Sequence, residues 1–163
     1  MIKMEKVSFS YKSEDKIQVS DLIIEIKAGE FVLLCGKSGC GKTTISKMIN
    51  GLIPHVIDGN YQGKVTIDNK AVREMETFEI AEKVGSIFQN PKTQFFNLDS
   101  DGELSFGLEN MGVEPRLIKA IVQNTINELA IENLKNRNVF ELSGGEKQIL
   151  AVASVSLSPP QCL

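Results

Sequence analysis

A glycine-rich segment of eight residues carries the side chains best suited to phosphate chemistry. Gly36-Lys37-Ser38-Gly39-Cys40-Gly41-Lys42-Thr43 matches the pattern G-x-x-x-x-G-K-[ST] at every position. The glycines let successive backbone N–H groups face inward, which makes an anion nest at the start of a helix. Lys42 brings a positive charge to terminal phosphates, and the Thr43 hydroxyl can join the coordination shell of Mg2+. We therefore expect residues 36–44, Thr44 included, to bind ATP with Mg2+.

The segments on either side of this loop are the elements that would position it. Glu30 to Cys35 is a short continuous apolar run, typical of a strand buried on both faces of a parallel sheet. Thr43 to Asn50 has the apolar spacing of a helix, and Gly51 is a natural stop. A glycine-rich turn that merely joins a strand to a helix is the alternative. The matching context of strand, loop and helix favours a phosphate site.

The rest of the chain divides into strand-like and helix-like stretches. Alternating residues predict a strand at 22–27, closed by a turn at Ala28-Gly29, and a second strand at 64–68, closed by a turn at Asn69-Lys70. Short apolar segments predict a strand at 84–88 and the beginning of one at 161–163. Helical periodicity predicts helices from Pro115 through Leu129 and from Ser143 to about Leu157, where Ser158-Pro159-Pro160 ends the second.

A second glycine pair stands at the predicted start of the last helix. Ser143 and Glu146 have the spacing of a capping box, in which each side chain bonds to the backbone N–H of the other residue. Gly144 and Gly145 are unnecessary for a cap, and they leave bare backbone N–H groups at a helix N-terminus, again a place for phosphate. The sequence permits both a plain helix cap and a second phosphate contact.

The two motifs together resemble the nucleotide-binding subunits of ABC transporters. In that family a signature segment closes over the ATP held by the partner subunit, and here it corresponds to Leu142, Ser143, Gly144, Gly145, Glu146, Lys147 and Gln148. Gln89 looks like the glutamine that touches the metal and the attacking water and senses the membrane partner. Tyr11 looks like the aromatic residue that stacks on adenine. A solvated loop amide at Gln89 and an ordinary strand aromatic at Tyr11 are the alternatives.

Three further stretches are similar to a subgroup of this family. IFQNPKTQFF, ELSFGLEN and GLIPHVIDGNYQGKV resemble the energy-coupling-factor ATPases, which power uptake of vitamins, their precursors, or cobalt and nickel. The resemblance implies a second ABC ATPase subunit, in a homodimer or heterodimer, and an integral-membrane transport subunit as partners. His55 lies in the third stretch, and we expect a packing or solvated role for it.

The implied fold is an α/β P-loop NTPase, a three-layer core with an inserted helical subdomain, incomplete at the C-terminus. We expect a nucleotide-binding core over residues 1–90, the helical subdomain over 91–135, and the signature helix with a return to the core over 136–163. No Asp or Glu follows Glu146. We therefore expect this chain by itself to lack the acidic pair and the switch histidine that the resemblance implies, and to show weak hydrolysis and low stability.

Composition limits the remaining classes of function. The formal net charge is −3 for 163 residues, which argues against a nucleic-acid partner. The longest apolar runs are too short to cross a bilayer, and the N-terminus lacks the apolar core of a secretory signal, so we expect a cytoplasmic protein held at the membrane by its partners. The rivals are a truncated nucleotide-binding module without hydrolysis and a non-transport ABC ATPase of DNA repair or translation.

Overall fold

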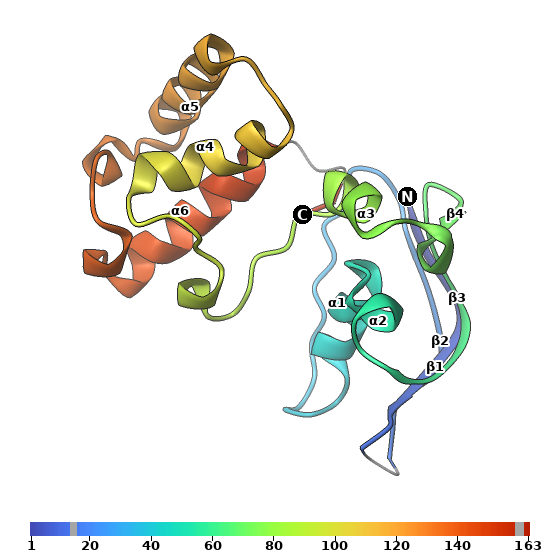
Figure 1. Cartoon of the computed structure of the whole chain (residues 1–163). Helices are drawn as coiled ribbons and strands as arrows, with labels where there is room; N and C mark the ends of the chain where they lie inside the picture. Colours follow the sequence, from blue (N-terminus) through green and yellow to red (C-terminus); the bar gives the residue numbers. More distant parts are fainter. Residues whose placement is uncertain (14–15, 159–161) are drawn as a thin grey trace. The chain divides into compact units, whose positions relative to one another are not determined.

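Alternating apolar residues near the N-terminus build an antiparallel sheet. The computed structural model describes residues 1–13, 16–158 and 162–163, which form two compact units, residues 1–84 and 85–163. The first unit contains four strands in the order β2-β1-β3-β4 (Figure 1). Their bounds are Ile2–Tyr11 for β1, Ile17–Ile26 for β2, Gly59–Ile67 for β3 and Lys70–Ala71 for β4. The predicted strands at 22–27 and 64–68 are thus confirmed in part: each ends one residue earlier and begins five residues earlier than predicted.

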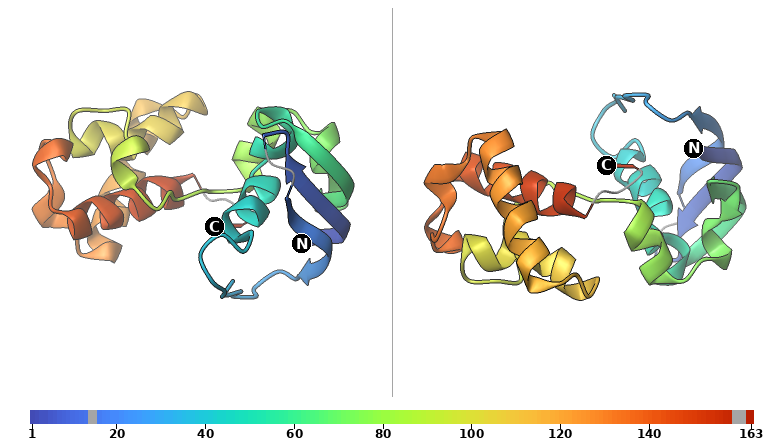
Figure 2. Two further views of the ribbon diagram at one scale, coloured as in Figure 1. Left: turned by 90° about the horizontal axis from the view of Figure 1, so that it is seen from below. Right: turned by 90° about the horizontal axis from the view of Figure 1, so that it is seen from above.

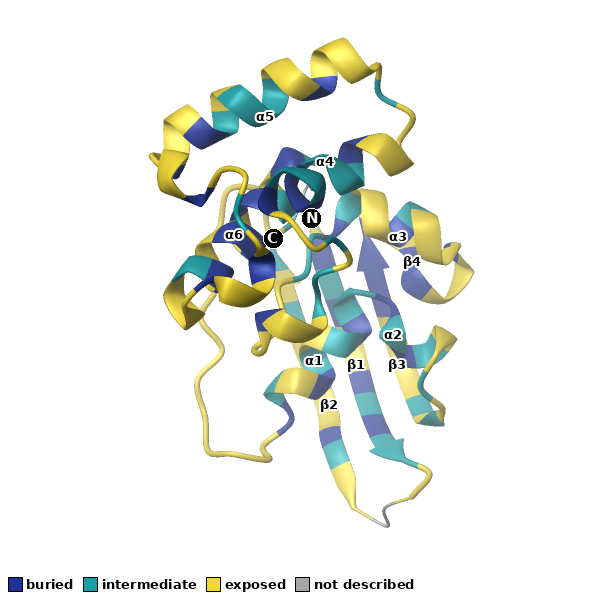
Figure 3. Cartoon of the chain, turned by 60° about the vertical axis from the view of Figure 1, so that its left-hand side comes forward, coloured by how far each residue is buried: buried dark blue, intermediate teal, exposed yellow. Residues whose placement is uncertain are grey.

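The central strand β1 changes its inward face part-way along its length. Met4 and Phe9 are both buried although they are five positions apart, an odd spacing that would place them on opposite faces of a regular strand. Lys6 has a φ of 48° at the point where the pairing of β1 with β2 shifts register. Such a bulge restores the apolar face to the core, and Figure 3 shows the buried bands that alternate along β1.

Short helices cover one face of this sheet. They are α1 (Lys42–Ile49), α2 (Leu52–His55) and α3 (Thr77–Lys83), with a 3-10 turn η1 at Val72–Glu74 (Figures 1 and 2). Met48 and Ile80 are fully buried on this side of the sheet. The helix predicted after the phosphate loop is confirmed, and Gly51 follows it with a φ of 77°, a left-handed conformation suited to glycine.

The second unit is helical. Its main helices are α4 (Ser100–Asn110), α5 (Pro115–Leu129) and α6 (Gly144–Leu157), joined by 3-10 turns η2 (Pro91–Thr93), η3 (Glu132–Leu134) and η4 (Val139–Glu141). The three helices share an apolar core in which Leu104, Ile126 and Leu150 are fully buried. Both helices predicted in this part of the sequence are confirmed. The division at residues 90 and 135 stays a prediction.

Two predicted strands do not form. Residues 30–35 have no regular secondary structure, and in the predicted strand at 84–88 only Val84 forms a single β-bridge. The predicted strand at 161–163 begins at Gln161, outside the described residues, and Cys162 forms a single β-bridge. Phe31 and Leu33 are 94% and 74% exposed rather than buried. A parallel strand is held by hydrogen bonds to strands on both sides, and the described residues provide no such neighbours for residues 30–35. Apolar sequence alone therefore did not produce a strand.

Helix length sets a limit on membrane insertion. Among the described residues, no helix combines the length and apolar character needed to cross a bilayer.

Candidate functional site

The phosphate loop folds back on the side chain of Lys42. The Lys42 ammonium donates hydrogen bonds to the carbonyl oxygens of Gly36 and Lys37, both at 2.8 Å, and lies 3.5 Å from the Cys40 Sγ atom. The Lys42 side chain thus joins the end of the loop to its beginning. The sequence-predicted loop residues are brought together at the start of α1, as the motif requires.

Glycine is needed at two positions of this loop for conformational reasons. Gly39 and Gly41 have φ values of 76° and 95°, a region that side-chain-bearing residues rarely adopt. A Cβ atom at Gly41 would also lie 2.6 Å from the carbonyl oxygen of Gln18 in β2. The close approach of the loop to the sheet therefore depends on the absence of a side chain at residue 41.

The N-terminus of α1 is chemically suited to an anion. Gly41 is the N-cap residue, no side chain caps the helix, and its first turn contains no acidic residue. The first backbone N–H groups of a helix have no partner within the helix, and its dipole places positive charge there. Lys42 adds a full positive charge, and the exposed Thr43 places a hydroxyl beside it. This set of donors fits a polyphosphate with its magnesium ion.

Tyr11 lies beside the phosphate-loop helix although it is far from it in sequence. Its hydroxyl group and the Thr44 Oγ1 atom are 3.1 Å apart. Phe9 meets the Tyr11 ring edge-on, with centroids 4.9 Å apart, and the Lys47 ammonium lies over the ring at 5.8 Å. These contacts place an aromatic ring, half-buried at the end of β1, next to the helix that carries Lys42 and Thr43.

The signature segment in the second unit forms the predicted capping box. The Ser143 N–H donates to the Glu146 carboxylate at 2.7 Å, and the Glu146 N–H donates to the Ser143 Oγ atom at 3.3 Å. Hydrogen bonds from Ser143 and the nearby Arg137 guanidinium lower the pKa of the Glu146 carboxyl. Gly144 and Gly145 are exposed, and an added Cβ atom would meet no atom within 4 Å at either. The backbone at the start of α6 is therefore open to a ligand.

Comparison with known proteins decides the family. A model of the family described as ABC transporter matches residues 19–163. The chain belongs to this family.

Individual ABC relatives match nearly the whole chain. It is 45% identical over 160 residues to a putative ABC transporter ATP-binding protein of Treponema denticola, an alignment that covers 98% of this chain and 33% of that protein. It is 36% identical over 164 residues to the putative HMP/thiamine import ATP-binding protein YkoD of Bacillus subtilis, covering 100% of this chain and 30% of the relative. The chain thus spans about a third of the length of these two relatives.

Solved ABC structures share its architecture. The structure of cbiO1 from Clostridium perfringens, part of the ABC transporter complex cbiONQ, superposes with a TM-score of 0.84 at 28% identity and covers 98% of this chain and 62% of that one. A dimeric ATP-binding cassette in a post-hydrolysis state with ADP and Pi gives a TM-score of 0.81 at 24% identity, a likeness of fold alone. The fold is therefore that of the P-loop NTPases, as predicted.

The remaining predicted residues of the ABC site divide between the two units. Tyr11 and residues 36–44 lie in the first unit, whereas Gln89 and the signature segment lie in the second. Gln89 is exposed, in a bend just before η2. His55 contacts the backbone of its own unit, since its Nε2 atom is 2.9 Å from the carbonyl oxygen of Val72.

Two polar side chains of the second unit, Gln94 and Glu103, were not singled out from the sequence. The Gln94 side-chain amide accepts a hydrogen bond from the Phe88 N–H at 3.0 Å and donates one to the Ser86 carbonyl oxygen at 3.2 Å. These two bonds fix the segment before Gln89. The Glu103 carboxylate is buried and receives the Asn97 N–H at 2.9 Å. An acidic residue in the first turn of a helix is expected at the surface, so the sequence held no signal for this role.

Proposed function

We propose that this chain is the ATP-binding part of an ABC-type import ATPase. The observation that carries the proposal is the loop in which Lys42, two left-handed glycines and an uncapped helix N-terminus converge. Family membership supports ATP as the nucleotide. Because the chain spans only part of its relatives, the activity of the whole protein is part of the proposal.

Four predicted site residues, Lys42, Thr43, Gln89 and Tyr11, have separate tasks in this proposal. The Lys42 ammonium exchanges its two carbonyl partners for the terminal phosphates, since a charged acceptor makes the stronger hydrogen bond. The Thr43 hydroxyl and the Gln89 amide are the side chains that would hold Mg2+, which neutralises phosphate charge when bound. Tyr11 offers its ring to the adenine base, with the hydroxyl held by Thr44.

The signature segment serves a second nucleotide. The open backbone of Gly144 and Gly145, at the capped start of α6, would face the phosphates of ATP held by another ABC subunit. In this arrangement Gln89 links the nucleotide to a membrane partner. Hydrolysis by the assembled subunits would then drive solute uptake through that partner.

The transported solute is proposed to be a vitamin, a vitamin precursor or a transition-metal ion. The resemblance to energy-coupling-factor ATPases in the stretches around residues 51–65 and 87–110 supports this class. The names of two matched proteins agree with it, since one is described as an HMP/thiamine import protein and the other as part of cbiONQ.

Nucleotide binding is tested by a substitution at the loop lysine. We expect Lys42→Ala to abolish measurable binding of a fluorescent ATP analogue in the presence of Mg2+, because the ammonium that lies against the Gly36 and Lys37 carbonyl oxygens is lost. Lys64→Ala, at an exposed lysine of β3, is the matched control and should bind normally. Unchanged affinity of the Lys42→Ala protein would show that the phosphate-loop assignment is wrong.

The transport proposal is tested in cells. A strain lacking the gene should take up less labelled thiamine precursor, cobalt or nickel, and the wild-type gene but not its Lys42→Ala version should restore uptake. Equal uptake of all three solutes with and without the gene would contradict the proposed solute class.

A further inference from the structure

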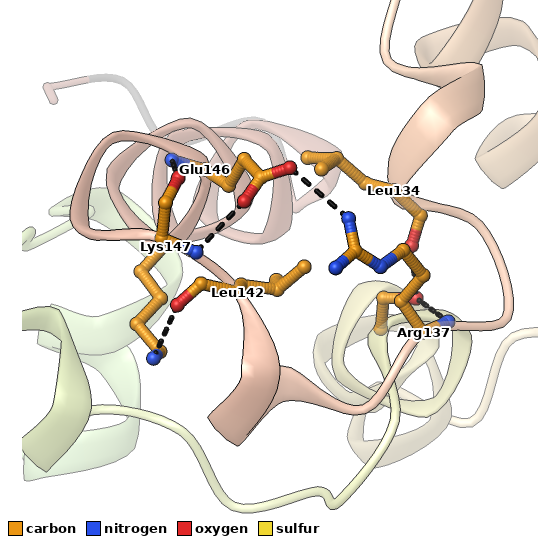
Figure 4. A network of polar contacts seen from close by, with 7 residues as sticks. Leu134, Arg137, Leu142, Glu146 and Lys147 are labelled. Carbon is orange, nitrogen blue, oxygen red and sulfur yellow. Dashed lines mark hydrogen bonds and ion pairs between the residues drawn. The ribbon is translucent and has the colours of Figure 1, made fainter.

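The turn that leads into the signature segment encloses a buried cation. Lys147, in the first turns of α6, is only 5% exposed. Its ammonium donates to the carbonyl oxygens of Phe140 at 3.0 Å and Leu142 at 2.6 Å. These carbonyls stand at the end of η4, directly before Ser143, and Figure 4 shows the lysine reaching back from the helix to Leu142. Lys147 is therefore committed to the backbone of its own chain.

A second cation holds the other side of the same turn. The Arg137 guanidinium lies 3.1 Å from the Glu146 carboxylate, the group that also caps Ser143 (Figure 4). The backbone of Arg137 is fixed in turn, because its N–H donates to the Ser100 Oγ atom at 3.1 Å and its carbonyl oxygen accepts from the Ser100 N–H at 3.0 Å. Ser100 is fully buried at the start of α4. The arginine thus ties the capping glutamate to a rigid part of the helical core.

We propose that Lys147 and Arg137 position the signature segment and do not themselves contact nucleotide. Lys147 fixes residues 139–142 from the buried side of the turn. Arg137 fixes the Glu146 carboxylate from the partly exposed side. This inference rests on the proposed function in one respect, the binding of a second nucleotide by the signature segment. Lys147 is then no longer among the residues expected to touch ATP. Arg137, which the sequence did not single out, becomes a second positioning residue.

The two cations differ in how strongly they fix the turn before Ser143. The Lys147 side chain is buried and donates to two carbonyl oxygens, and the contact with Leu142 is itself buried, so loss of the ammonium leaves a buried acceptor without this partner. The Arg137–Glu146 pair is partly exposed, with side chains 39% and 26% accessible, and such pairs contribute little by themselves. The lysine should therefore be the stronger of the two positioning residues.

Hydrogen exchange tests the positioning directly, without nucleotide. The backbone N–H groups of Phe140, Ser143 and Glu146 all have side-chain partners within the turn, so they should exchange slowly in the wild-type chain. We expect Lys147→Met to raise exchange at residues 139–146 about tenfold, Arg137→Met to raise it by less, and Lys147→Arg to restore protection in part. Lys119→Met, at an exposed lysine of α5, is the control and should leave exchange unchanged.

Two outcomes of this experiment would overturn the proposal. Unchanged exchange at residues 139–146 in Lys147→Met would show that the ammonium does not fix the turn. An equal rise across α4, α5 and the far end of α6 would show a general packing role instead of a positioning one.

A second measurement separates positioning from the proposed function. With Mg-ATP, self-association of the chain should weaken about tenfold in Lys147→Met, as in Ser143→Ala, whereas binding of the ATP analogue at the phosphate loop should stay unchanged. Self-association of Lys147→Met at the wild-type level would overturn the inference. A wild-type chain that binds ATP without associating would instead count against the proposed second-nucleotide contact, and the exchange result would still decide the role of Lys147.

Discussion

Two side-chain contacts fix the first turn of α1 in this ABC protein, one from a distant part of the chain and one from within the phosphate loop. The hydroxyl of Tyr11 reaches Thr44 across 33 positions, and the ammonium of Lys42 reaches back to the carbonyl of Gly36. Both contacts involve the first turn of α1. The first turn of α1 therefore determines the position of both the Tyr11 ring and the Lys42 ammonium.

At this scale Tyr11 offers the sharpest test. We expect Tyr11→Ala to weaken ATP binding severalfold, because a stacked aromatic contact is worth about 1 kcal/mol. Tyr11→Phe keeps the ring and should bind ATP normally, while the lost hydrogen bond to Thr44 lowers the free energy of unfolding by about 1 kcal/mol. Titration with the ATP analogue and urea denaturation measure the two effects. Equal ATP affinities of all three proteins would assign Tyr11 to the core alone.

At the scale of elements, the start of α6 depends on an ionised glutamate. Ser143 and Arg137 stabilise the charged form of Glu146 and lower its pKa below the ordinary value of 4.5. A lowered pKa in the folded state means that this contribution to stability is complete above pH 4.5 and is lost as the pH falls through the folded-state pKa.

The pH dependence of stability checks this element. We expect Glu146→Gln to be less stable than the wild-type chain at neutral pH and the difference to shrink below pH 4.5, where the wild-type carboxyl becomes protonated. Glu109→Gln, at an exposed glutamate of α4, should show little difference at any pH. Urea denaturation across this pH range is the measurement. A difference between Glu146→Gln and wild type that stayed constant with pH would contradict the ionised cap.

The segment before the phosphate loop is an element of a different kind, since its apolar side chains face solvent. Phe31 and Leu33 are largely exposed, and contiguous exposed apolar residues favour association. We expect the double variant Phe31→Ser with Leu33→Ser to bind less of an environment-sensitive hydrophobic dye and to scatter less light on warming. Phe78→Ser, at an exposed phenylalanine of α3, is the control. Identical dye binding by wild type and double variant would show that these side chains are covered in solution.

At the scale of the whole molecule, ATP should stabilise one unit before the other. The phosphate loop and Tyr11 belong to residues 1–84, and the signature segment belongs to residues 85–163. Binding to the folded state alone stabilises it by about 2.7 kcal/mol at a ligand concentration of 100 times Kd.

Hydrogen exchange at two protein concentrations tests this order. At low concentration, Mg-ATP should slow exchange in residues 1–84 and around Gln89 but not at residues 143–146, because the proposed binding to the loop needs no second copy. At high concentration, protection should extend to residues 143–146 if the signature segment meets the ATP of another copy. Protection of residues 143–146 that did not depend on protein concentration would contradict contact between copies.

The sequence by itself determined the local features of this protein. The loop motif, the helix after it and the capping box of α6 depend on neighbours within about four residues, so glycine positions and Ser-to-Glu spacing were sufficient to predict them. Alternation also predicted β2 and β3, because strands with one buried face carry a period of two. The family resemblance rested on the same short motifs.

Only the tertiary structure decided the features that depend on distant neighbours. The apolar run at 30–35 has the composition of a buried strand, yet no strand pairs with it among the described residues, and its side chains are exposed. The roles of Lys147 and Arg137 depend on carbonyl groups at the end of η4 and on a carboxylate group of α6. A charged residue in a helix is by default assigned to the surface, because burial is costly without partners, and those partners appear only when the chain is folded.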